Sequence, residues 1–151
     1  MAVIASTSIK DMSGLELMQA MVEGKLPMAP IATVIPMKGV TAEHGRILFE
    51  AQADERHLNP LGGVHGGFAA TVMDSVTACA VHTVLEAGVG YATVDLNVKM
   101  VKAVPRGIPL LAEGKVIFVS RSLGIAEGTL KDADGALYAH ATATCLIMRP
   151  K

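Results

Sequence analysis

The stretch from His65 to Glu86 constrains the fold most, because its pattern predicts a helix with almost no polar face. It contains no Pro and no Gly after Gly67, and it stops just before Gly88, a common helix terminator. At about 1.5 Å per residue it predicts a helix roughly 33 Å long. Apolar and small residues cover most of its directions, so we expect other elements to surround it.

The rest of the chain is predicted to supply those elements mainly as strands. Alternation or continuous apolar runs predict strands at 31–38, 47–54, 92–100, 110–119, 123–131 and 136–148. In the strand at 92–100, the even-numbered apolar residues from Ala92 to Met100 are expected to share one face. Asp132 to Gly135 forms a strong hairpin turn between the last two strands.

One long helix among several short-linked strands indicates the α+β class. An antiparallel sheet needs only one covered face, and a single helix wrapped by the sheet provides it most simply. We expect one such domain over residues 30–151. Residues 1–29 form an N-terminal segment with a short helix at 13–24, which ends at Gly24 and Pro27.

Composition excludes several classes of function. Thirteen basic and fourteen acidic residues nearly cancel and form no block, so a nucleic-acid partner is not expected. Cys79 and Cys145 are far apart in apolar runs, which predicts free thiols in a reducing, cytoplasmic setting and no metal site. The first ten residues do not resemble a leader, and no apolar stretch reaches the ~18 residues of a membrane span.

Asp74 is the first candidate for chemistry, because it is the only carboxylate in the first twenty residues of the apolar helix. Burying an unpaired carboxylate costs free energy. One interpretation is structural, with Asp74 tied to Ser75, to Thr77 or to a neighbouring strand. The other is a general base or nucleophile whose pKa is set by its surroundings.

His65-Gly66-Gly67 begins the same helix. Glycines there leave backbone N–H groups open at the positive end of the helix, where an oxyanion or a polarised carbonyl can bind. Asp74 follows His65 by nine residues, or roughly 13 Å along the axis, too far for both to touch one carbon atom. Two antiparallel copies about a two-fold axis would bring Asp74 of one chain near Gly66 of the other.

With these features the sequence resembles the hotdog-fold thioesterases of the 4-hydroxybenzoyl-CoA thioesterase superfamily, in particular the phenylacetic-acid-degradation type. The resemblance covers residues 30–148 and includes Asn59 in a Pro/Gly loop, His65-Gly66-Gly67, the acid nine residues on, the Ala-rich helix and the strands after it. It implies an antiparallel sheet wrapped around one central helix.

The resemblance also implies roles for individual residues. Asp74 would be the catalytic carboxylate, the Gly66 amide would polarise the thioester carbonyl, and His65 and Asn59 would orient the reacting groups. The acid and the helix terminus would come from different subunits of a homodimer or homotetramer.

Four further residues are expected to contact the substrate. Gly67 and Ser75 adjoin the two catalytic positions, and family members often hold CoA through the segment that here contains Arg121 and Ser122. In one branch of the family a Thr stands four residues after the acid. That position is Ala78 here, so the role of a neighbouring hydroxyl stays open.

The function predicted from the sequence is hydrolysis of small or aromatic acyl-CoA thioesters. CoA is part of the substrate, and no metal or other cofactor is expected. Asp74 could act as nucleophile or as general base, and the sequence does not separate the two. Hydration or dehydration of an acyl thioester and non-catalytic binding of acyl-CoA remain alternatives.

Overall fold

A computed structural model describes residues 8–151. Residues 1–7 lie outside this range. They include the start of the predicted N-terminal segment and most of the ten residues compared with a leader. The helices are α1 (Gly14–Val22), α2 (Ile31–Val34) and α3 (Gly66–His82), with 3₁₀ turns at Ile9–Asp11 and Glu55–His57. The strands are β1 (Met37–Glu43), β2 (Arg46–Ala51), β3 (Gly90–Met100), β4 (Leu110–Val119), β5 (Leu123–Lys131) and β6 (Leu137–Met148).

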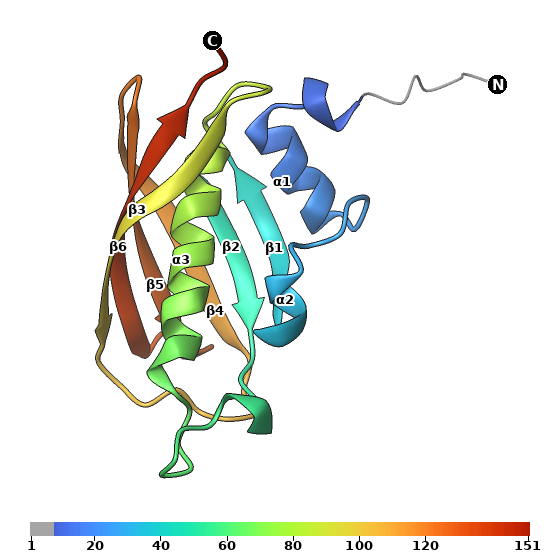
Figure 1. Ribbon diagram of the computed structural model, residues 1–151. Coiled ribbons are helices and arrows are strands. Elements are labelled where there is room, and N and C mark those ends of the chain that lie inside the picture. The colour runs from blue at the N-terminus through green and yellow to red at the C-terminus, as the bar shows by residue number, and fades with distance from the viewer. Residues whose placement is uncertain (1–7) are drawn as a thin grey trace, which may run out of the picture.

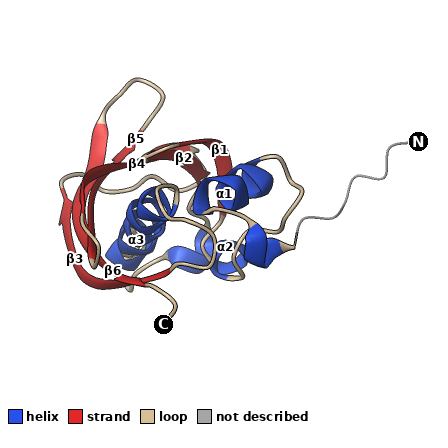
Figure 2. Ribbon diagram, turned by 90° about the horizontal axis from the view of Figure 1, so that it is seen from above, coloured by secondary structure: helices blue, strands red, loops and turns tan. Residues whose placement is uncertain are grey.

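The strands form one antiparallel sheet in the order β1-β2-β4-β5-β6-β3. This sheet curls around α3, as the view from above shows, while α1 and α2 lie toward the β1 edge (Figure 2). The α+β class and the central helix inside a wrapped sheet are therefore confirmed. The strands at 110–119 and 123–131 have the predicted bounds.

Close contact between α3 and the sheet requires glycine at one position of β4. Phe68, Val72 and Val76 of α3 are almost fully buried against the sheet. A Cβ atom placed on Gly114 would lie 2.1 Å from the carbonyl oxygen of Val76, which is a backbone atom. Gly114 thus sets how near β4 can approach the helix.

The helix α3 is shorter than predicted, with 17 residues from Gly66 to His82. After His82 the chain continues in three-residue turns, because the Val84 and Leu85 N–H groups donate to carbonyls three residues back. The Thr83 hydroxyl donates to Ala80 O at 2.6 Å and accepts from Gly45 N–H at 2.8 Å. It thereby joins the end of the helix to the β1–β2 turn.

The expectation that α3 is surrounded on all sides is wrong for the single chain. Its small and polar residues Ala70, Thr71, Asp74 and Ser75 are only half-buried. They lie three or four positions apart and so form one stripe along the helix. We call these four residues the open stripe of α3.

The strand predicted at 31–38 is also wrong, because residues 31–34 form the short helix α2 and β1 begins only at Met37. The apolar run at 31–38 suggested a strand. Pro30, however, has helical dihedral angles, and the ring of His57 hydrogen-bonds the Val34 carbonyl at the end of the turn. A tertiary contact thus outweighs the local preference.

The strand β3 differs from the predicted alternation because of a bulge between Thr93 and Asp95. Two residues there oppose one on the partner strand, so the alternation of inward-facing residues shifts by one position across the bulge. Before the bulge Tyr91 and Thr93 are half-buried, and Ala92 and Val94 are exposed instead of facing the core; beyond it Leu96 and Val98 face inward as predicted.

The N-terminal helix α1 packs onto the same core. Its N-cap Ser13 and Glu16 form a reciprocal capping box, which explains where the helix begins. Met18 is buried, and Gly14 donates to Leu85 O at 3.0 Å. Within residues 8–151, none of the helices has the length and hydropathy of a membrane span.

Candidate functional site

The N-terminus of α3 opens into a hollow of about 250 Å³ lined by His65, Gly66, Met100 and Lys102, among others. Gly66 is the first residue of the helix, so its N–H has no intrahelical acceptor. Among residues 8–151 we find no other acceptor for it. This N–H can donate to a ligand oxygen at the positive end of α3.

His65 is the N-cap of α3, and a hydrogen bond to its ring determines which ring nitrogen carries the hydrogen. The Gly67 N–H donates to His65 Nδ1 at 2.8 Å. A neutral imidazole that accepts at Nδ1 carries its hydrogen on Nε2, so the ring presents a donor. Gly67, predicted to contact substrate, uses its own N–H in this contact, and Gly66 supplies the open one.

Asp74 lies two turns further along α3. This helix packs beside the bulged strand β3 (Figure 1). It lines a separate open hollow of about 320 Å³ together with Thr93, Val94, Asp95 and Leu96. Its Oδ1 atom is buried and has no hydrogen-bond partner among the described residues. An orphaned carboxylate oxygen is costly in a resting protein, which favours a role for Asp74 in binding or catalysis.

The structural interpretation of Asp74 gains no support from its neighbours on the helix. The Thr77 hydroxyl donates to two backbone carbonyls, those of Met73 at 2.7 Å and of Asp74 at 3.2 Å. Neither contact uses the carboxylate. Ser75 is half-buried beside Asp74 and lines neither hollow.

Polar groups lie behind Asp74, between α3 and the strands β3 and β6. Burial, with a smaller contribution from the negative charge of Asp74, raises the pKa of the Cys79 thiol to about 12. Burial likewise raises the pKa of Tyr91 and of Cys145. These groups therefore stay neutral near pH 7, and both cysteines are free thiols, as predicted.

Thr93 is a site residue that the sequence did not reveal. It comes immediately before the bulge, and its side chain lines the hollow of Asp74. Its hydroxyl lies 3.9 Å from Cys145 Sγ, the one side-chain contact recorded for it in the described chain. Alternation had placed Thr93 on the solvent face, so only the position of the bulge could have identified it.

Asn59 shapes the loop before α3. Its Oδ1 accepts from the N–H groups of Leu61 at 2.9 Å and Gly63 at 3.2 Å, and its own N–H donates to Gly63 O at 2.7 Å. Asn59 lines neither hollow within one chain.

Arg121 and Ser122 lie at the opposite end of the sheet from Gly66. They form the β4–β5 turn, beside the end where Leu123 pairs with Leu146 and Gly90 with Met148. Met100, which adjoins Gly66, is at the other end of β3. One chain therefore does not bring Arg121 or Ser122 to the α3 terminus.

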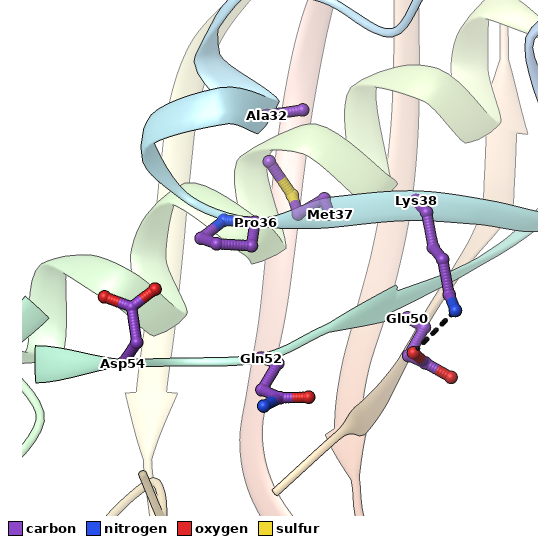
Figure 3. A pocket seen from close by; sticks show the side chains of 7 residues that line it. All are labelled: Ala32, Pro36, Met37, Lys38, Glu50, Gln52 and Asp54. Atoms are coloured by element: carbon purple, nitrogen blue, oxygen red, sulfur yellow. Dashed lines mark ion pairs between the residues drawn. The ribbon is translucent and has the colours of Figure 1, made fainter. Parts of the chain in front are cut away.

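Another hollow, of about 310 Å³, lies at the β1 edge (Figure 3). Its charged groups are already paired: Lys38 Nζ lies 3.0 Å from Glu50, and Asp54 binds Arg56 at 2.8 Å. Nothing there provides a nucleophile beside an open donor. We therefore place the candidate active site at α3.

Comparison with known proteins defines the class. The thioesterase superfamily model matches residues 61–139, which include the α3 terminus and Asp74. Human acyl-coenzyme A thioesterase 13 is 28% identical over 101 residues, 66% of this chain and 71% of that protein. A phenylacetic acid degradation-related protein from Ralstonia eutropha JMP134 is 29% identical with a TM-score of 0.78, covering 85% of this chain and 98% of that one.

A third protein, from Streptococcus mutans and solved with bound acetyl-CoA, has a TM-score of 0.73 at 20% identity over 83% of this chain and 99% of that one, which shows a common fold. The chain belongs to the thioesterase superfamily. It is a hotdog-fold hydrolase of acyl-CoA thioesters.

Proposed function

We propose that the chain hydrolyses small or aromatic acyl-CoA thioesters at sites shared between two copies, with Asp74 of one chain and the Gly66 N–H of the partner acting on one carbonyl. The observation that carries this proposal is the separation of two incomplete half-sites along α3. One hollow has the open donor, and the other has the unpartnered carboxylate. Neither is complete in a single chain.

Two elements support the same position for a two-fold axis. On α3, the residue midway between Gly66 and Asp74 is Ala70, which belongs to the open stripe. On β3, Asp95 and Leu96 adjoin Asp74, and Met100 adjoins Gly66. The β3 residue midway between these two places is Val98. An axis level with Ala70 and Val98 sets each Asp74 level with the Gly66 of the partner.

The edge position of β3 favours this pairing. β3 ends the sheet order, so the backbone groups along its outer side are free to bind another strand. Antiparallel pairing of two β3 strands would continue the sheet and set the two α3 helices side by side. The small residues of the open stripe allow them to approach closely. A homodimer results, and two dimers could form the homotetramer predicted from the sequence.

The reaction consumes one water and releases the free acid and CoA. Asp74 either attacks the carbonyl carbon, forming an anhydride that water then hydrolyses, or removes a proton from water as it attacks. The Gly66 N–H stabilises the negative oxygen that forms, and the His65 Nε2–H provides a second donor nearby. These groups require no metal or redox cofactor.

The acyl group would occupy the hollow of Asp74. Its volume of about 320 Å³ suits a short chain or one aromatic ring. The similarity to a phenylacetic acid degradation-related protein and to a fold solved with acetyl-CoA supports this size range. The two free thiols favour a cytoplasmic setting.

The test is a screen of purified protein against short, branched, aromatic and long acyl-CoAs, with released thiol detected colorimetrically. We expect turnover, with kcat/KM highest for short or aromatic acyl groups and lower for long chains. Wild-type protein that binds these thioesters without releasing thiol would instead indicate a non-catalytic binder, and hydration of an enoyl thioester would indicate a hydratase.

A further inference from the structure

Leu61 is the most exposed large apolar side chain within residues 8–151. It is 96% exposed, whereas the next, Val94, is 60% exposed. Leu61 lies in the turn that leads into α3, residues 58–64, which we call the tip hairpin. This hairpin projects beyond the N-terminal end of α3, at the lower end of the view (Figure 1). Single apolar residues are common on protein surfaces, so its surroundings must decide whether it has a partner.

The tip hairpin holds Leu61 in a defined position. At its base, Leu58 and Val64 form an antiparallel bridge. Above the base, the Asn59 N–H donates to Gly63 O at 2.7 Å. The Asn59 Oδ1 atom accepts the Leu61 N–H at 2.9 Å. Because the hairpin is already ordered by these bonds, Leu61 can contact a partner without a further loss of loop entropy.

A matching surface lies on α3 beyond Asp74. Cys79 and His82 are half-buried and continue the open stripe toward the C-terminal end of the helix, since Cys79 follows Ser75 by four residues. They follow Asp74 by about 7.5 and 12 Å along the helix axis. The Tyr91 ring of β3 lies 4.7 Å from the ring of His82, between centroids. A thiol and two rings therefore form a mainly apolar surface at this level of α3.

The two-fold axis of the proposed dimer brings these two features to the same level. With the axis level with Ala70, Cys79 and His82 lie about 13.5 and 18 Å from it along α3. Gly66 lies about 6 Å from the axis in the other direction. Leu61 lies further out on the tip hairpin by the rise of three extended residues, roughly 10 Å, which places it roughly 16 Å from the axis. The partner's Leu61 is therefore level with Cys79 and His82.

We propose that the partner's Leu61 packs at Cys79 and Tyr91, closes the hollow of Asp74 and thereby limits the size of the acyl group. This inference rests on the proposed function, because it uses the same two-fold axis. In the single chain the hollow is lined by α3 and β3 alone. An acyl group that runs from Asp74 toward Cys79 would meet Leu61 after about 7.5 Å, which suits a short chain or one aromatic ring.

The contact is tested first without enzyme activity. The chain contains no Trp, so Leu61→Trp introduces a single indole. Val34→Trp is the control, because Val34 is 58% exposed on α2, at the opposite edge of the sheet from β3. We expect the indole of Leu61→Trp to be shielded from iodide and that of Val34→Trp to be quenched.

Tryptophan is larger than leucine, so the comparison is repeated with the smaller side chains of Leu61→Cys and Val34→Cys. After subtraction of the wild-type rate, alkylation should be much slower for Leu61→Cys. Where the two pairs disagree, the cysteine pair decides. Equal alkylation at both positions would overturn the inference.

Acyl preference tests what the contact does. In Leu61→Ala, kcat/KM for decanoyl-CoA relative to butyryl-CoA should rise about tenfold or more, because the wall that limits the acyl group is removed. Val34→Ala should keep the wild-type ratio. If wild-type protein releases no thiol, the proposed hydrolysis is wrong, and the same ratio is then measured as binding affinities by calorimetry. An unchanged ratio in Leu61→Ala contradicts the inference in either case.

Mixed dimers identify the chain that supplies Leu61. When Asp74→Ala chains are combined with Gly66→Pro chains, which lack the Gly66 N–H, the intact site takes both Gly66 and Leu61 from the Asp74→Ala chain. Leu61→Ala should therefore change the acyl preference when the Asp74→Ala chain carries it. A change when only the Gly66→Pro chain carries it would show that Leu61 acts within its own chain, against the inference.

Discussion

At the scale of single residues, the proposed chemistry depends most on Asp74. Because its Oδ1 is buried without a partner, Asp74→Asn should remove the reactive group at little cost to the fold. We expect kcat to fall at least ~100-fold, within the usual range for loss of a general acid or base, with an unchanged or higher melting temperature. Thiol release measures kcat, and calorimetry measures the melting temperature. Activity near the wild-type level would contradict the assignment, and aggregation would favour the structural interpretation.

A second residue-scale prediction concerns Thr93, whose hydroxyl shares the hollow of Asp74. Thr93→Val keeps the shape of the side chain and removes its hydrogen-bonding capacity. If the hydroxyl positions water or substrate, kcat/KM should fall about tenfold, the effect of one hydrogen bond of roughly 1.4 kcal/mol. A variant that retains full activity would limit Thr93 to packing against Cys145.

The buried ring of His82 should make the free energy of unfolding depend on pH. Burial lowers its pKa from the ordinary value, and its Nδ1 is buried without a partner in the described chain. The folded state keeps the ring neutral, whereas the unfolded chain takes up a proton below about pH 6.5. The stabilisation is therefore present above that pH and is lost as the pH falls through it.

The variant for this test is His82→Phe, which keeps a ring beside Tyr91, whose centroid lies 4.7 Å from that of His82. Urea unfolding at pH 7.5 and pH 5 should show a larger loss of unfolding free energy in wild type than in the variant. Other titrating groups contribute equally to both proteins. Parallel pH profiles would show that His82 does not titrate on unfolding.

At the scale of elements, the sequence predicted the strands from β2 to β6 and missed the helix α2 and the bulge in β3. The strands β4 and β5 follow directly from their patterns. The helix α2 does not, because a contact from His57, distant in sequence, defines its end. The β3 bulge is equally hidden, since Val94 continues the alternation while facing solvent.

The candidate site was predicted in part for the same reason. His65, Gly66 and Asp74 were found because a polar residue or a glycine at that place in an apolar helix is conspicuous. Thr93 depends on the bulge and was missed. The CoA contacts were inferred from resemblance alone, and only three-dimensional placement shows that Arg121 and Gly66 lie at opposite ends of one chain.

The contact between β4 and α3 gives an element-scale prediction of stability. Gly114→Ala would place a methyl group 2.1 Å from a helix carbonyl, where only backbone movement can relieve the clash. We expect destabilisation of about 2 kcal/mol or more, toward the upper part of the range for overpacking. Gly63→Ala is the control, since its nearest atom is 3.5 Å away on the Asn59 side chain, and it should change stability by less than about 0.5 kcal/mol. Equal effects of the two variants in urea unfolding would contradict this packing.

At the scale of the whole molecule, the proposed active site requires two copies of the chain. The open stripe of α3 and the free edge of β3 belong to one side of a shared interface, and each half-site lacks what the other contains. Sedimentation velocity should therefore show a dimer or a larger closed assembly at assay concentrations. A well-folded monomer with full activity would be incompatible with a shared site.

The shared active site can be tested by mixing two inactive variants, Asp74→Ala and Gly66→Pro. Proline fits the first position of a helix, and the extended conformation of His65 (φ −62°, ψ 137°) is compatible with a following proline. Gly66→Ala is the matched control, because it retains the N–H. Its added methyl group meets only the flexible Met100 side chain, so this variant should keep measurable activity.

The decisive measurement is thiol release by the two variants after they are refolded together. Each mixed dimer would hold one site with an intact Asp74 and an intact Gly66, and one site with both defects. Activity should therefore return to about half of the wild-type value per mixed dimer, as two equivalent sites on a two-fold axis require. If subunit exchange is demonstrated and no activity returns at any mixing ratio, Asp74 acts with groups of its own chain and the shared site is wrong.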